Sequence, residues 1–350
     1  MKFSANWQRN CLIALCVVLA VILIVMIFAT SYVNHLLNYI GRVDPSDEGT
    51  MSSEDIADMT EETDPDYTGP YVDPTDITID VLPTVPGGAD DQEHIINILL
   101  VGQDRREGEG RKRSDVMMLC TFNTEKKTIT LTSFLRDTYS YVPGYGYRKL
   151  NVPYAIGGFK LLNETLKVNF GVHVDANVEV DFFRFIEIVD LLGGVDITLT
   201  EKEADYMNNT MGVDVNPDQF KPVKAGKNHL NGTQALLYSR IRKIDSDFGR
   251  TQRQRTVVMA IINAYKNKSL PTMLSLVKDI LPMVKTDMTN EEIMDYVVEL
   301  FPMIAGAEYN TMYIPAKGTW ESEYVKGLGS CLIPDLEENR GILEKLFKGE

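Results

Sequence analysis

The sequence predicts an α/β protein in which a central mixed β-sheet is flanked by helices, an α-β-α sandwich, preceded by a single N-terminal transmembrane helix. Two observations support this prediction. After residue 92, short apolar runs of strand length alternate with segments of helical periodicity, a pattern typical of layered α/β folds. Near the N-terminus, residues 11–29 contain no charged side chain, and at ~1.5 Å per residue such a helix spans about 28 Å of hydrocarbon.

The N-terminal segment is predicted to be a signal anchor. Lys2 and Arg9 precede the apolar run, and no Lys or Arg follows it until position 42, so the positive-inside rule places residues 1–10 in the cytoplasm as a short tail. Ala29–Ser31 resembles a cleavage site, but the apolar run exceeds the ~7–15 residues of a secretory signal. We therefore expect residues 11–31 to remain in the cell membrane as a single span, with the rest of the chain extracytoplasmic.

The negative charge of the chain is concentrated in one stretch. The formal net charge is −15, and fifteen acidic residues with no Lys or Arg lie from Asp44 to Asp91, whereas acids and bases balance elsewhere. The stretch has few aliphatic side chains, so it cannot bury enough apolar surface to fold. Residues 32–91 are predicted to be an acidic disordered linker that holds the folded domain away from the membrane. Disorder without a spacing role is the alternative.

The folded domain is predicted at residues 92–268. Runs rich in apolar and β-branched residues predict strands at 95–101, 116–122, 128–134, 177–180 and 195–199. Helical periodicity predicts helices at 158–169, 181–192, 248–268, 273–284 and 291–304. The last two helices lie within residues 269–350, which are predicted to form a helical C-terminal extension packed on the domain.

Charged side chains collect at the ends of the first three predicted strands. Asp104 and Arg106 follow the first strand, Arg113 and Asp115 precede the second, and Arg136 follows the third. Ligands bind at strand ends in α/β sheets. We therefore expect a binding site where these ends meet.

A second group of candidate residues surrounds the start of the helix predicted at 248–268. Its members are Arg240, Arg242, Arg250, Arg253 and Gln254. If residues 239–243 are extended, the first two project from one face, and the other three share the core-facing side of the helix. A guanidinium directed toward a core needs an anion, and its forked donors match phosphate oxygens. The group therefore predicts a bound polyanion, and the alternative is a structural network of arginine–carboxylate pairs.

Asp104 and Asp115 are candidate metal ligands. Two carboxylates beside phosphate-binding arginines are the usual protein contribution to a Mg²⁺ site, with substrate phosphates and water completing the octahedron. Two acids eleven residues apart are also compatible with unrelated surface carboxylates.

The helix predicted at 181–192 is apolar around most of its circumference. Such a helix is either buried in the core or forms a wall of a cavity that holds a lipid. Two cysteines, Cys120 and Cys331, lie outside the predicted membrane span. An oxidising exterior permits a disulfide between them, but the apolar strand around Cys120 favours a buried free thiol.

The order of motifs along the chain resembles the LytR-CpsA-Psr family of cell-envelope phosphotransferases from about residue 97 to residue 255. The matching segments are Gly102–Arg106, Arg113–Asp115, Ser133–Asp137, Lys149–Tyr154, Val180–Phe185, Leu192–Asp196, Leu230–Leu236, Arg240–Arg242 and Asp247–Gln254. Two segments depart from the family pattern: Ser-Phe-Leu-Arg-Asp replaces Ser-Ile-Pro-Arg-Asp at 133–137, and Asn-Val-Pro-Tyr replaces Asn-Ala-Ala-Tyr at 151–154. Neither departure removes a charged group.

The resemblance implies an enzyme that transfers a phosphoglycan from a polyprenyl-diphosphate carrier to peptidoglycan, the glycan being a wall teichoic acid, a capsular polymer or another secondary wall polymer. It implies Mg²⁺ or Mn²⁺ held with the help of Asp104 and Asp115, and a polyprenyl tail in an apolar tunnel between sheet and helices. The diphosphate would be bound by Arg113, Arg136, Arg240, Arg242 and Arg250, with Gln254 nearby. The matched motifs add Arg106 and Asp247 to the candidate catalytic residues.

Two rival functions use the same residues. One is a non-catalytic protein that binds polyprenyl lipids or regulates the envelope, and the other is a hydrolase that releases the carrier phosphate to water. The metal-placing acids argue against the first rival, because a lipid sensor does not need them. Nucleic-acid binding is not expected, because the basic residues form a compact cluster outside the cytoplasm and no broad stripe. We therefore expect a single-pass protein of the cell membrane, with its catalytic domain outside the cytoplasm, in an envelope of the Gram-positive type.

Overall fold

The computed structural model describes residues 41–42, 67–77, 94–105, 110–212, 220–266, 268, 272 and 279–349. The predicted cytoplasmic tail and membrane span, residues 1–31, lie outside these ranges, and so does Arg106. Within the described ranges, no helix is both long enough and apolar enough to cross a bilayer.

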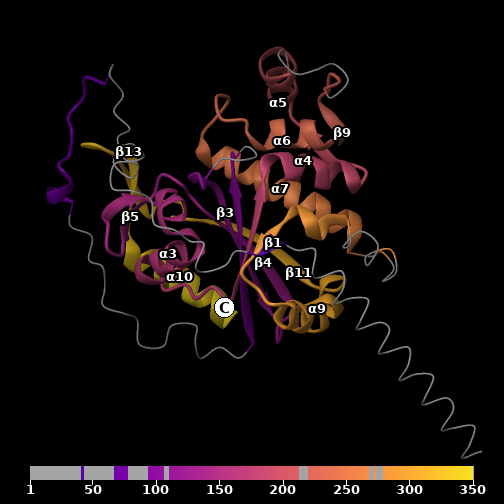
Figure 1. Cartoon of the computed structure of the whole chain (residues 1–350). Helices are drawn as coiled ribbons and strands as arrows, with labels where there is room; N and C mark the ends of the chain where they lie inside the picture. Colours follow the sequence, from indigo (N-terminus) through magenta and orange to yellow (C-terminus); the bar gives the residue numbers. More distant parts are fainter. Residues whose placement is uncertain are drawn as a thin grey trace, which may run out of the picture.

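A seven-stranded mixed sheet forms the centre of the molecule (Figure 1). Its spatial order is β1-β10-β7-β2-β3-β4-β11. The strands are β1 Gly41–Arg42, β2 Ile95–Gln103, β3 Ser114–Asn123, β4 Thr128–Phe134, β7 Ala176–Asp181, β10 Lys285–Thr286 and β11 Glu308–Ile314. β2 is antiparallel to β3 and parallel to β7, and β4 is antiparallel to β3 and parallel to β11. The predicted central mixed sheet is confirmed.

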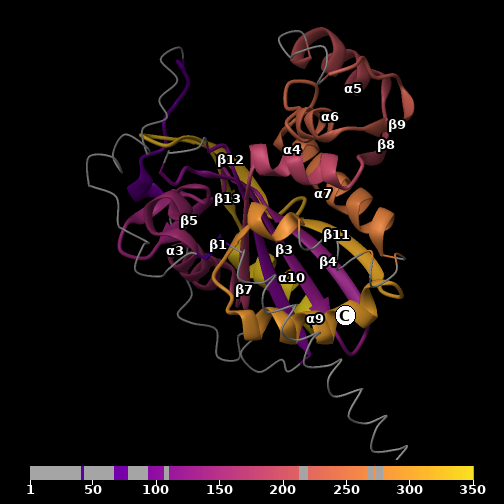
Figure 2. The same ribbon diagram turned by 45° about the vertical axis from the view of Figure 1, so that its right-hand side comes forward.

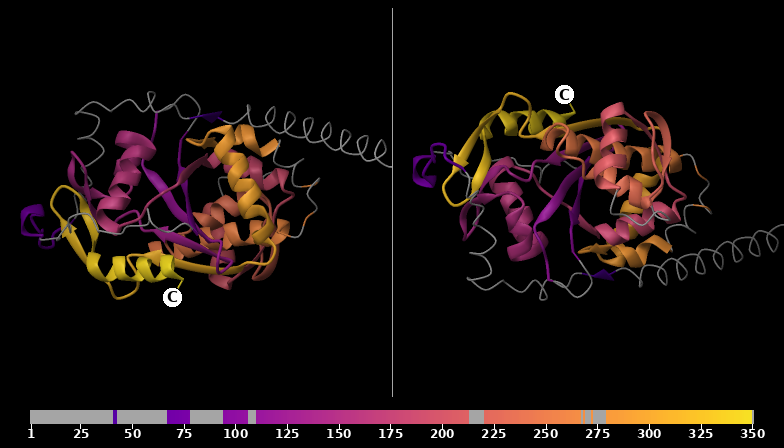
Figure 3. Two further views of the ribbon diagram at one scale, coloured as in Figure 1. Left: turned by 90° about the horizontal axis from the view of Figure 1, so that it is seen from below. Right: turned by 90° about the horizontal axis from the view of Figure 1, so that it is seen from above.

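Helices cover both faces of the sheet, so most side chains of β3 and β4 are buried. On one face lie α3 Val152–Phe170 and α10 Leu336–Lys348, and on the other lie α7 Asp247–Tyr265 and α9 Asn290–Ile304. Figure 3 shows the magenta and yellow helices on one side of the strands and the orange helices on the other. Each face has its own apolar cluster, centred on residues such as Phe134 and Leu162 on the first and Met118 and Leu131 on the second. The predicted α-β-α sandwich is therefore confirmed.

A smaller unit sits beside the end of the sheet, over α7 (Figure 2). It consists of α4 Phe182–Leu191, β8 Val195–Leu199, α5 Glu201–Tyr206, the π-helix η3 Met207–Met211, β9 Gly226–Leu230 and α6 Gly232–Ser239. Its separate apolar cluster joins β8, β9, α5 and α6 to Val257 of α7. Capping boxes begin α5 at Thr200 and α6 at Asn231, where a side-chain oxygen accepts from the third helical N–H.

Two hairpins complete the described structure. They are β5 Tyr139–Val142 with β6 Gly146–Lys149, and β12 Trp320–Val325 with β13 Gly329–Pro334. A bridge between Thr138 and Leu332 connects them. Two short 3-10 helices, η1 Pro74–Asp76 and η4 Leu281–Met283, lie in the connections.

The C-terminal region differs from its prediction. Residues 269–350 were expected to be helical, but β11 pairs along its whole length with β4 inside the central sheet, and β12 and β13 form a hairpin. The helical prediction is wrong for residues 308–334 because β11 is a polar edge strand, Glu-Tyr-Asn-Thr-Met-Tyr-Ile, without the apolar run that identifies a buried strand. The helix predicted at 291–304 agrees with α9. Of the helix predicted at 273–284, residues 273–278 lie outside the described ranges and residues 279–283 are helical.

Two parts of the predicted linker are ordered against the domain. Gly41 and Arg42 pair with β10 at the sheet edge. Residues 67–77 run along β12, where Val72 exchanges backbone hydrogen bonds with Tyr324 and Lys326 at 3.0 Å each. The expectation of disorder is wrong for these residues, because backbone pairing and aromatic contacts replace the apolar core that the composition lacks. The rest of the stretch lies outside the described ranges.

The two cysteines outside the predicted span are both buried free thiols. Cys120 lies on β3 and Cys331 on β13. Burial raises the pKa of Cys120 to about 12, so this thiol is inert at neutral pH.

Candidate active site

The sheet gathers the predicted site residues at one edge. β2, β4 and β11 end at this edge and antiparallel β3 begins there. Asp104 therefore directly follows β2, Asp115 is the second residue of β3, and Arg136 lies just after the end of β4. The meeting of strand ends predicted from the sequence is what the topology produces.

Asp115 is the acceptor around which the arginines converge. Its Oδ1 lies 2.9 Å from Nη1 of Arg136, 3.3 Å from Nη2 of Arg242 and 3.7 Å from Nη1 of Arg250. The backbone carbonyl of Asp115 also accepts from Arg250 Nη1 at 3.3 Å. Three guanidinium groups therefore share the one carboxylate of Asp115, and Asp137 and Asp247 supply further negative charge to Arg136 and Arg250.

Asp247 orients two of these arginines from the first turn of α7. Its Oδ1 lies 2.7 Å from Nε of Arg250, which is one turn further along the helix, and 3.7 Å from Nε of Arg136. The Arg250 side chain is only 2% exposed. Burial lowers the pKa of Arg136, but the carboxylates of Asp137, Asp247 and Asp115 outweigh this effect and raise it overall. Asp247 thus acts here through the arginines it holds.

A polar cleft of about 640 Å³ opens at this sheet edge. Among its lining residues are six basic side chains and two carboxylates: Lys112, Arg113, Arg136, Arg240, Arg242, Lys243, Asp104 and Asp115. Burial, followed by the charges of Arg250 and Arg136, lowers the pKa of Arg242. Such repulsion among cations is relieved by a bound anion. The cleft is therefore suited to a ligand with more than one negative charge.

Arg240 marks the border between this cleft and an apolar cavity. It was expected on an extended segment, but residues 232–239 form α6 and Arg240 is the helix C-cap with αR backbone angles. Its Nη2 contacts Asp104 Oδ2 at 3.2 Å, and its guanidinium lies over the Phe182 ring, 4.9 Å from the centroid. The extended geometry considered for residues 239–243 is wrong at its start, because Ser239 is the last residue of α6 and Arg240 is its C-cap.

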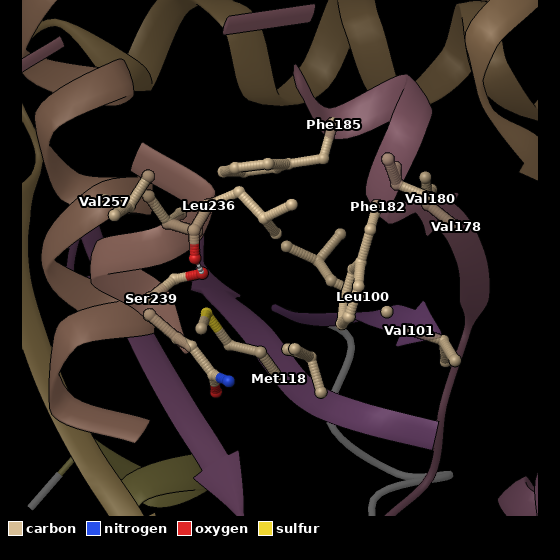
Figure 4. A pocket seen from close by; sticks show the side chains of 14 residues that line it. Leu100, Val101, Met118, Val178, Val180, Phe182, Phe185, Leu236, Ser239 and Val257 are labelled. Atoms are coloured by element: carbon tan, nitrogen blue, oxygen red, sulfur yellow. Dashed lines mark hydrogen bonds between the residues drawn. The ribbon is translucent and has the colours of Figure 1, made fainter. Parts of the chain in front are cut away.

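The apolar cavity has a volume of about 150 Å³ and lies between β2, β3, β7, α4, α6 and α7 (Figure 4). Leu100, Val180, Phe182 and Leu236 point into it. Its polar lining residues are Ser239, whose hydroxyl donates to the Leu236 carbonyl at 2.7 Å, and Gln254. Gln254, predicted near the diphosphate, is thus placed on the cavity wall at the end nearest Arg250.

The helix predicted at 181–192 is α4, and it forms a cavity wall. Phe182 and Phe185 line the cavity, Val189 is buried in the neighbouring cluster, and Phe183 is 55% exposed. The apolar side chains of α4 therefore fall into three sets, which face the cavity, the neighbouring core cluster and solvent. Of the two alternatives left open by the sequence, the structure supports the cavity wall.

A buried network beneath the cleft was not anticipated. Glu179, 3% exposed on β7, accepts from Gln103 Nε2 at 2.6 Å and from the hydroxyl of Tyr154, and lies 3.2 Å from Arg105. Burial, then the charge of Glu179, raises the pKa of Tyr154. The network fixes the end of β2 immediately before Asp104. A single acid between valines in a predicted buried strand was the available signal.

Arg253 belongs to a structural network of arginine–carboxylate pairs, the alternative to anion binding that the sequence left open. Its Nε lies 2.7 Å from Glu203 Oε1, and its Nη1 lies 3.2 Å from Asp245 Oδ1 and donates to the Ile241 carbonyl. The side chain is 6% exposed. Arg253 therefore connects α7 to α5 and to the loop that precedes α7. It is not among the residues that line the cleft.

The carboxylate oxygens of Asp104 and Asp115 are the type of ligand that a hard divalent cation prefers. Both carboxylates line the one cleft, and the Asp104 side chain is 48% exposed. Within the described ranges, no group of three or more His, Cys, Asp or Glu side chains is placed to share a metal ion. Two carboxylates with substrate phosphates and water are a donor set that Mg²⁺ accepts.

Fold and site together define an α/β protein in which a cationic cleft lies next to an apolar cavity, an arrangement that fits an amphiphile with an anionic head. The chain belongs to the LytR_cpsA_psr family, whose model matches residues 52–339.

Three relatives illustrate this membership. The chain is 35% identical over 204 residues to TagU of Bacillus mycoides and 38% identical over 180 residues to TagT of Bacillus subtilis, both named polyisoprenyl-teichoic acid–peptidoglycan teichoic acid transferases. These matches cover 57% and 50% of this chain but only 62% and 53% of the relatives. The third, named regulatory protein MsrR of Staphylococcus aureus, is 32% identical over 249 residues, 70% of this chain and 72% of MsrR.

Solved structures show the same fold. A structure of TagT bound to LIIa-WTA matches with a TM-score of 0.59 and 27% identity, covering 76% of this chain and 94% of that chain. A structure of TagT with bound octaprenyl pyrophosphate lipid matches with a TM-score of 0.56 over 76% of this chain and 95% of that chain, at 24% identity, and supports the fold alone.

Proposed function

We propose that this protein transfers a phosphate-linked glycan from a polyprenyl-diphosphate carrier to peptidoglycan at the outer face of the cell membrane. The observation that carries the proposal is that two contrasting spaces lie next to each other. A cleft lined by six basic side chains lies beside a cavity lined almost wholly by apolar ones, and Arg240 of the cleft lies over Phe182 of the cavity. A diphosphate joined to an apolar chain is the ligand class that fills both spaces at once.

The names of the relatives support the class of reaction. TagU and TagT are named teichoic acid transferases acting on peptidoglycan, and TagT has been solved with LIIa-WTA bound. We propose that the glycan transferred by this chain is a secondary wall polymer, either a teichoic acid or a capsular polymer.

The proposed reaction is a displacement at phosphorus. A hydroxyl oxygen of the acceptor forms a bond to the phosphorus that carries the glycan, and the bond from that phosphorus to the bridging oxygen breaks. The electron pair leaves on polyprenyl phosphate, and the hydroxyl proton passes to solvent or to the leaving phosphate. Arg136, Arg242 and Arg250 would neutralise the phosphate oxygens and hold them in place, which provides most of the catalysis in phosphoryl transfer.

Asp104 and Asp115 are proposed to hold Mg²⁺ or Mn²⁺. A bound cation would supply Lewis-acid stabilisation of the phosphate charge. Asp104 is assigned to the metal before any role as base, because a carboxylate that binds a cation is a poor proton acceptor. Residues 11–31 are proposed to anchor the chain in the membrane with the site outside.

A transfer assay with the full chain tests the function. Asp104→Ala and Asp115→Ala should each shift the Mg²⁺ or Mn²⁺ concentration for half-maximal transfer upward by about tenfold or more, because each removes a charge that offsets desolvation of the ion. Asp196→Ala, which removes an acid on β8 with an 89% exposed side chain, is the matched control. The metal assignment is contradicted if saturating metal restores no activity to either variant.

The rival of a non-catalytic lipid-binding regulator has one supporting observation, the name of MsrR. The same assay decides between them. Stabilisation of the chain by a short-chain polyprenyl diphosphate without any metal-dependent release of polyprenyl phosphate would favour the regulator. Release to water at the same rate with and without peptidoglycan would favour a hydrolase.

A further inference from the structure

Three aromatic rings form a shelf beside the arginine cluster, on the side away from the apolar cavity. Phe248 of α7 stacks on Trp320, with ring centroids 5.1 Å apart and planes at 24°, and meets Tyr313 edge-on at 5.2 Å. All three side chains are partly exposed. We call Phe248, Tyr313 and Trp320 the aromatic shelf.

The sheet order fixes the position of the shelf. β7, β2 and β3 line the apolar cavity, β4 carries Arg136 at its end, and β11, which carries Tyr313, is the next strand beyond β4. Phe248 follows Asp247 directly, and Asp247 holds Arg250. Cavity, arginine cluster and shelf therefore succeed one another across the same sheet edge, and α7 borders all three.

The shelf is built as a firm surface. Arg255, 1% exposed, lies behind Tyr313 with its guanidinium 5.7 Å from the ring centroid. Tyr313 stands opposite Ser133 in the parallel β4–β11 register. The ring is thus backed by a cation on one side and by the sheet below, so its position does not depend on a ligand.

In-line displacement connects this geometry with the proposed reaction. In phosphoryl transfer the attacking and leaving oxygens lie roughly opposite each other across the phosphorus. If polyprenyl phosphate leaves toward the cavity, the acceptor oxygen approaches across Arg136 and Arg250 from the side of the shelf. C–H groups on one face of a pyranose ring carry partial positive charge and pack on the negative face of an aromatic ring.

We propose that the aromatic shelf binds a pyranose ring of the acceptor glycan and aligns its hydroxyl for attack. This inference rests on the proposed function and specifies its acceptor side. The ligand class is a peptidoglycan sugar, and the donor's own glycan, attached to the same phosphorus, is directed toward the polar cleft.

Fluorescence gives a direct test of binding. The chain has two tryptophans, Trp7 and Trp320, so Trp7→Phe in the full chain, in detergent micelles, leaves Trp320 as the only tryptophan, which is excited selectively at wavelengths that tyrosine does not absorb. A soluble peptidoglycan tetrasaccharide should change its emission saturably, and Phe248→Leu should weaken the apparent affinity by about fivefold. Absence of any saturable change with the tetrasaccharide overturns the proposal.

Kinetics separate the acceptor from the donor. Phe248→Leu and Trp320→Leu should raise the KM for the acceptor about fivefold while the KM for the donor stays within about twofold. Trp320→Phe, which keeps an aromatic face, should recover most of the loss. Tyr71→Leu, at a tyrosine 48% exposed in a different aromatic group, is the control expected to match the wild type.

The outcomes are distinct from failure of the proposed function. If the wild-type chain is neither stabilised by a short-chain polyprenyl diphosphate nor active in transfer, the proposed function fails, whatever the fluorescence shows. If transfer occurs but the shelf variants raise the donor KM as much as the acceptor KM, the shelf belongs to the donor glycan and the inference is wrong. If both KM values stay unchanged while thermal stability falls, the shelf is only a packing contact and the inference is also wrong.

Discussion

Five arginines between residues 240 and 255 share one side-chain type and have different environments. Arg253 is paired with the buried Glu203 and the exposed Asp245. Arg242 faces the cleft among other cations, and Arg255 is buried with Nε and Nη1 lacking any hydrogen-bond partner among the described residues. Helical spacing predicted that Arg250 and Arg253 face the core, but it missed the buried Arg255 and could not show which carboxylates meet the arginines. Glu203 lies 50 positions away from Arg253, and pairing at that separation depends on the whole fold.

The contrast between Arg253 and Arg255 gives a stability prediction. Arg253→Met strips Glu203 of its partner in a buried site and should lower the free energy of unfolding by about 3–5 kcal/mol. Arg255→Met removes a buried cation for which no carboxylate among the described residues compensates, and should raise the free energy of unfolding by about 1 kcal/mol. Denaturant unfolding of both variants at pH 7 is the measurement. Equal losses in the two would show that Arg255 has a counter-charge.

The pKa of Arg255 gives the same prediction a pH dependence. Burial lowers this pKa to about 10, so the folded state binds the proton less tightly than the unfolded state does. The destabilisation by the charge is therefore complete below pH 10 and declines as pH rises from about 10 toward the unfolded value. The stability advantage of Arg255→Met over the wild type should shrink in that window.

Arg242 lines the cleft, so its removal should change ligand affinity much more than stability, in contrast to the removal of Arg253. Burial and two neighbouring guanidinium groups lower its pKa, so Arg242→Gln should cost little stability in the ligand-free protein. It should weaken the binding of a short-chain polyprenyl diphosphate by about tenfold to a hundredfold. Thermal unfolding with and without this ligand measures both quantities. A large loss of stability with ligand-induced stabilisation unchanged would mean that Arg242 serves the fold and not the anion.

Among the elements, those with a strong apolar pattern were predictable. β2, β3 and β4 are covered on both faces, and such strands appear as continuous apolar runs. α4 and α7 were visible from their periodicity. β11 was not, because an edge strand with one solvated side needs no apolar run. The folding unit therefore does not end at residue 268, as the sequence suggested, but includes β11 and α10.

α10 is predicted to be essential for the core. Leu336, Leu343 and Phe347 pack in the same cluster as Phe134 and Phe170. Leu343 is 0% exposed, so Leu343→Ala should lower the free energy of unfolding by about 2–5 kcal/mol. Glu344→Ala, at a half-exposed neighbour, should be nearly neutral. A loss below about 1 kcal/mol for Leu343→Ala would show that α10 is a peripheral attachment.

At the scale of the whole molecule, the site depends on segments that are far apart in the sequence. The cleft draws residues from β2 to the loop after α6, and residues 67–77 fasten to β12 near the opposite end of the chain. Tyr67 stacks on Tyr324 with centroids 3.6 Å apart. The acidic composition predicted no structure here, because pairing with a distant hairpin leaves no local periodicity.

This attachment leads to a prediction for shortened chains. A chain beginning at residue 64 should unfold at a higher temperature than one beginning at residue 92, because the longer chain keeps the Tyr67–Tyr324 stack and the backbone bonds of Val72. The difference expected from these contacts is about 1–3 kcal/mol. Tyr67→Ala in the longer chain should remove much of it. Identical melting temperatures for the two chains would mean that residues 67–77 add nothing to the fold.

The pairing of β1 with β10 limits the length of chain between the predicted membrane span and the central sheet. If residues 11–31 span the membrane as predicted, only residues 32–40 separate the span from Gly41, which is paired into the sheet edge. Nine residues reach at most about 30 Å. The acidic stretch after them runs between two points on the same domain, so its length adds nothing to this reach. On that prediction the sheet edge at Gly41 stays within about 30 Å of the bilayer, near the depth at which a polyprenyl carrier would present its diphosphate. The proposed transfer would then require the acceptor in the growing wall to reach a domain tethered close to the lipid.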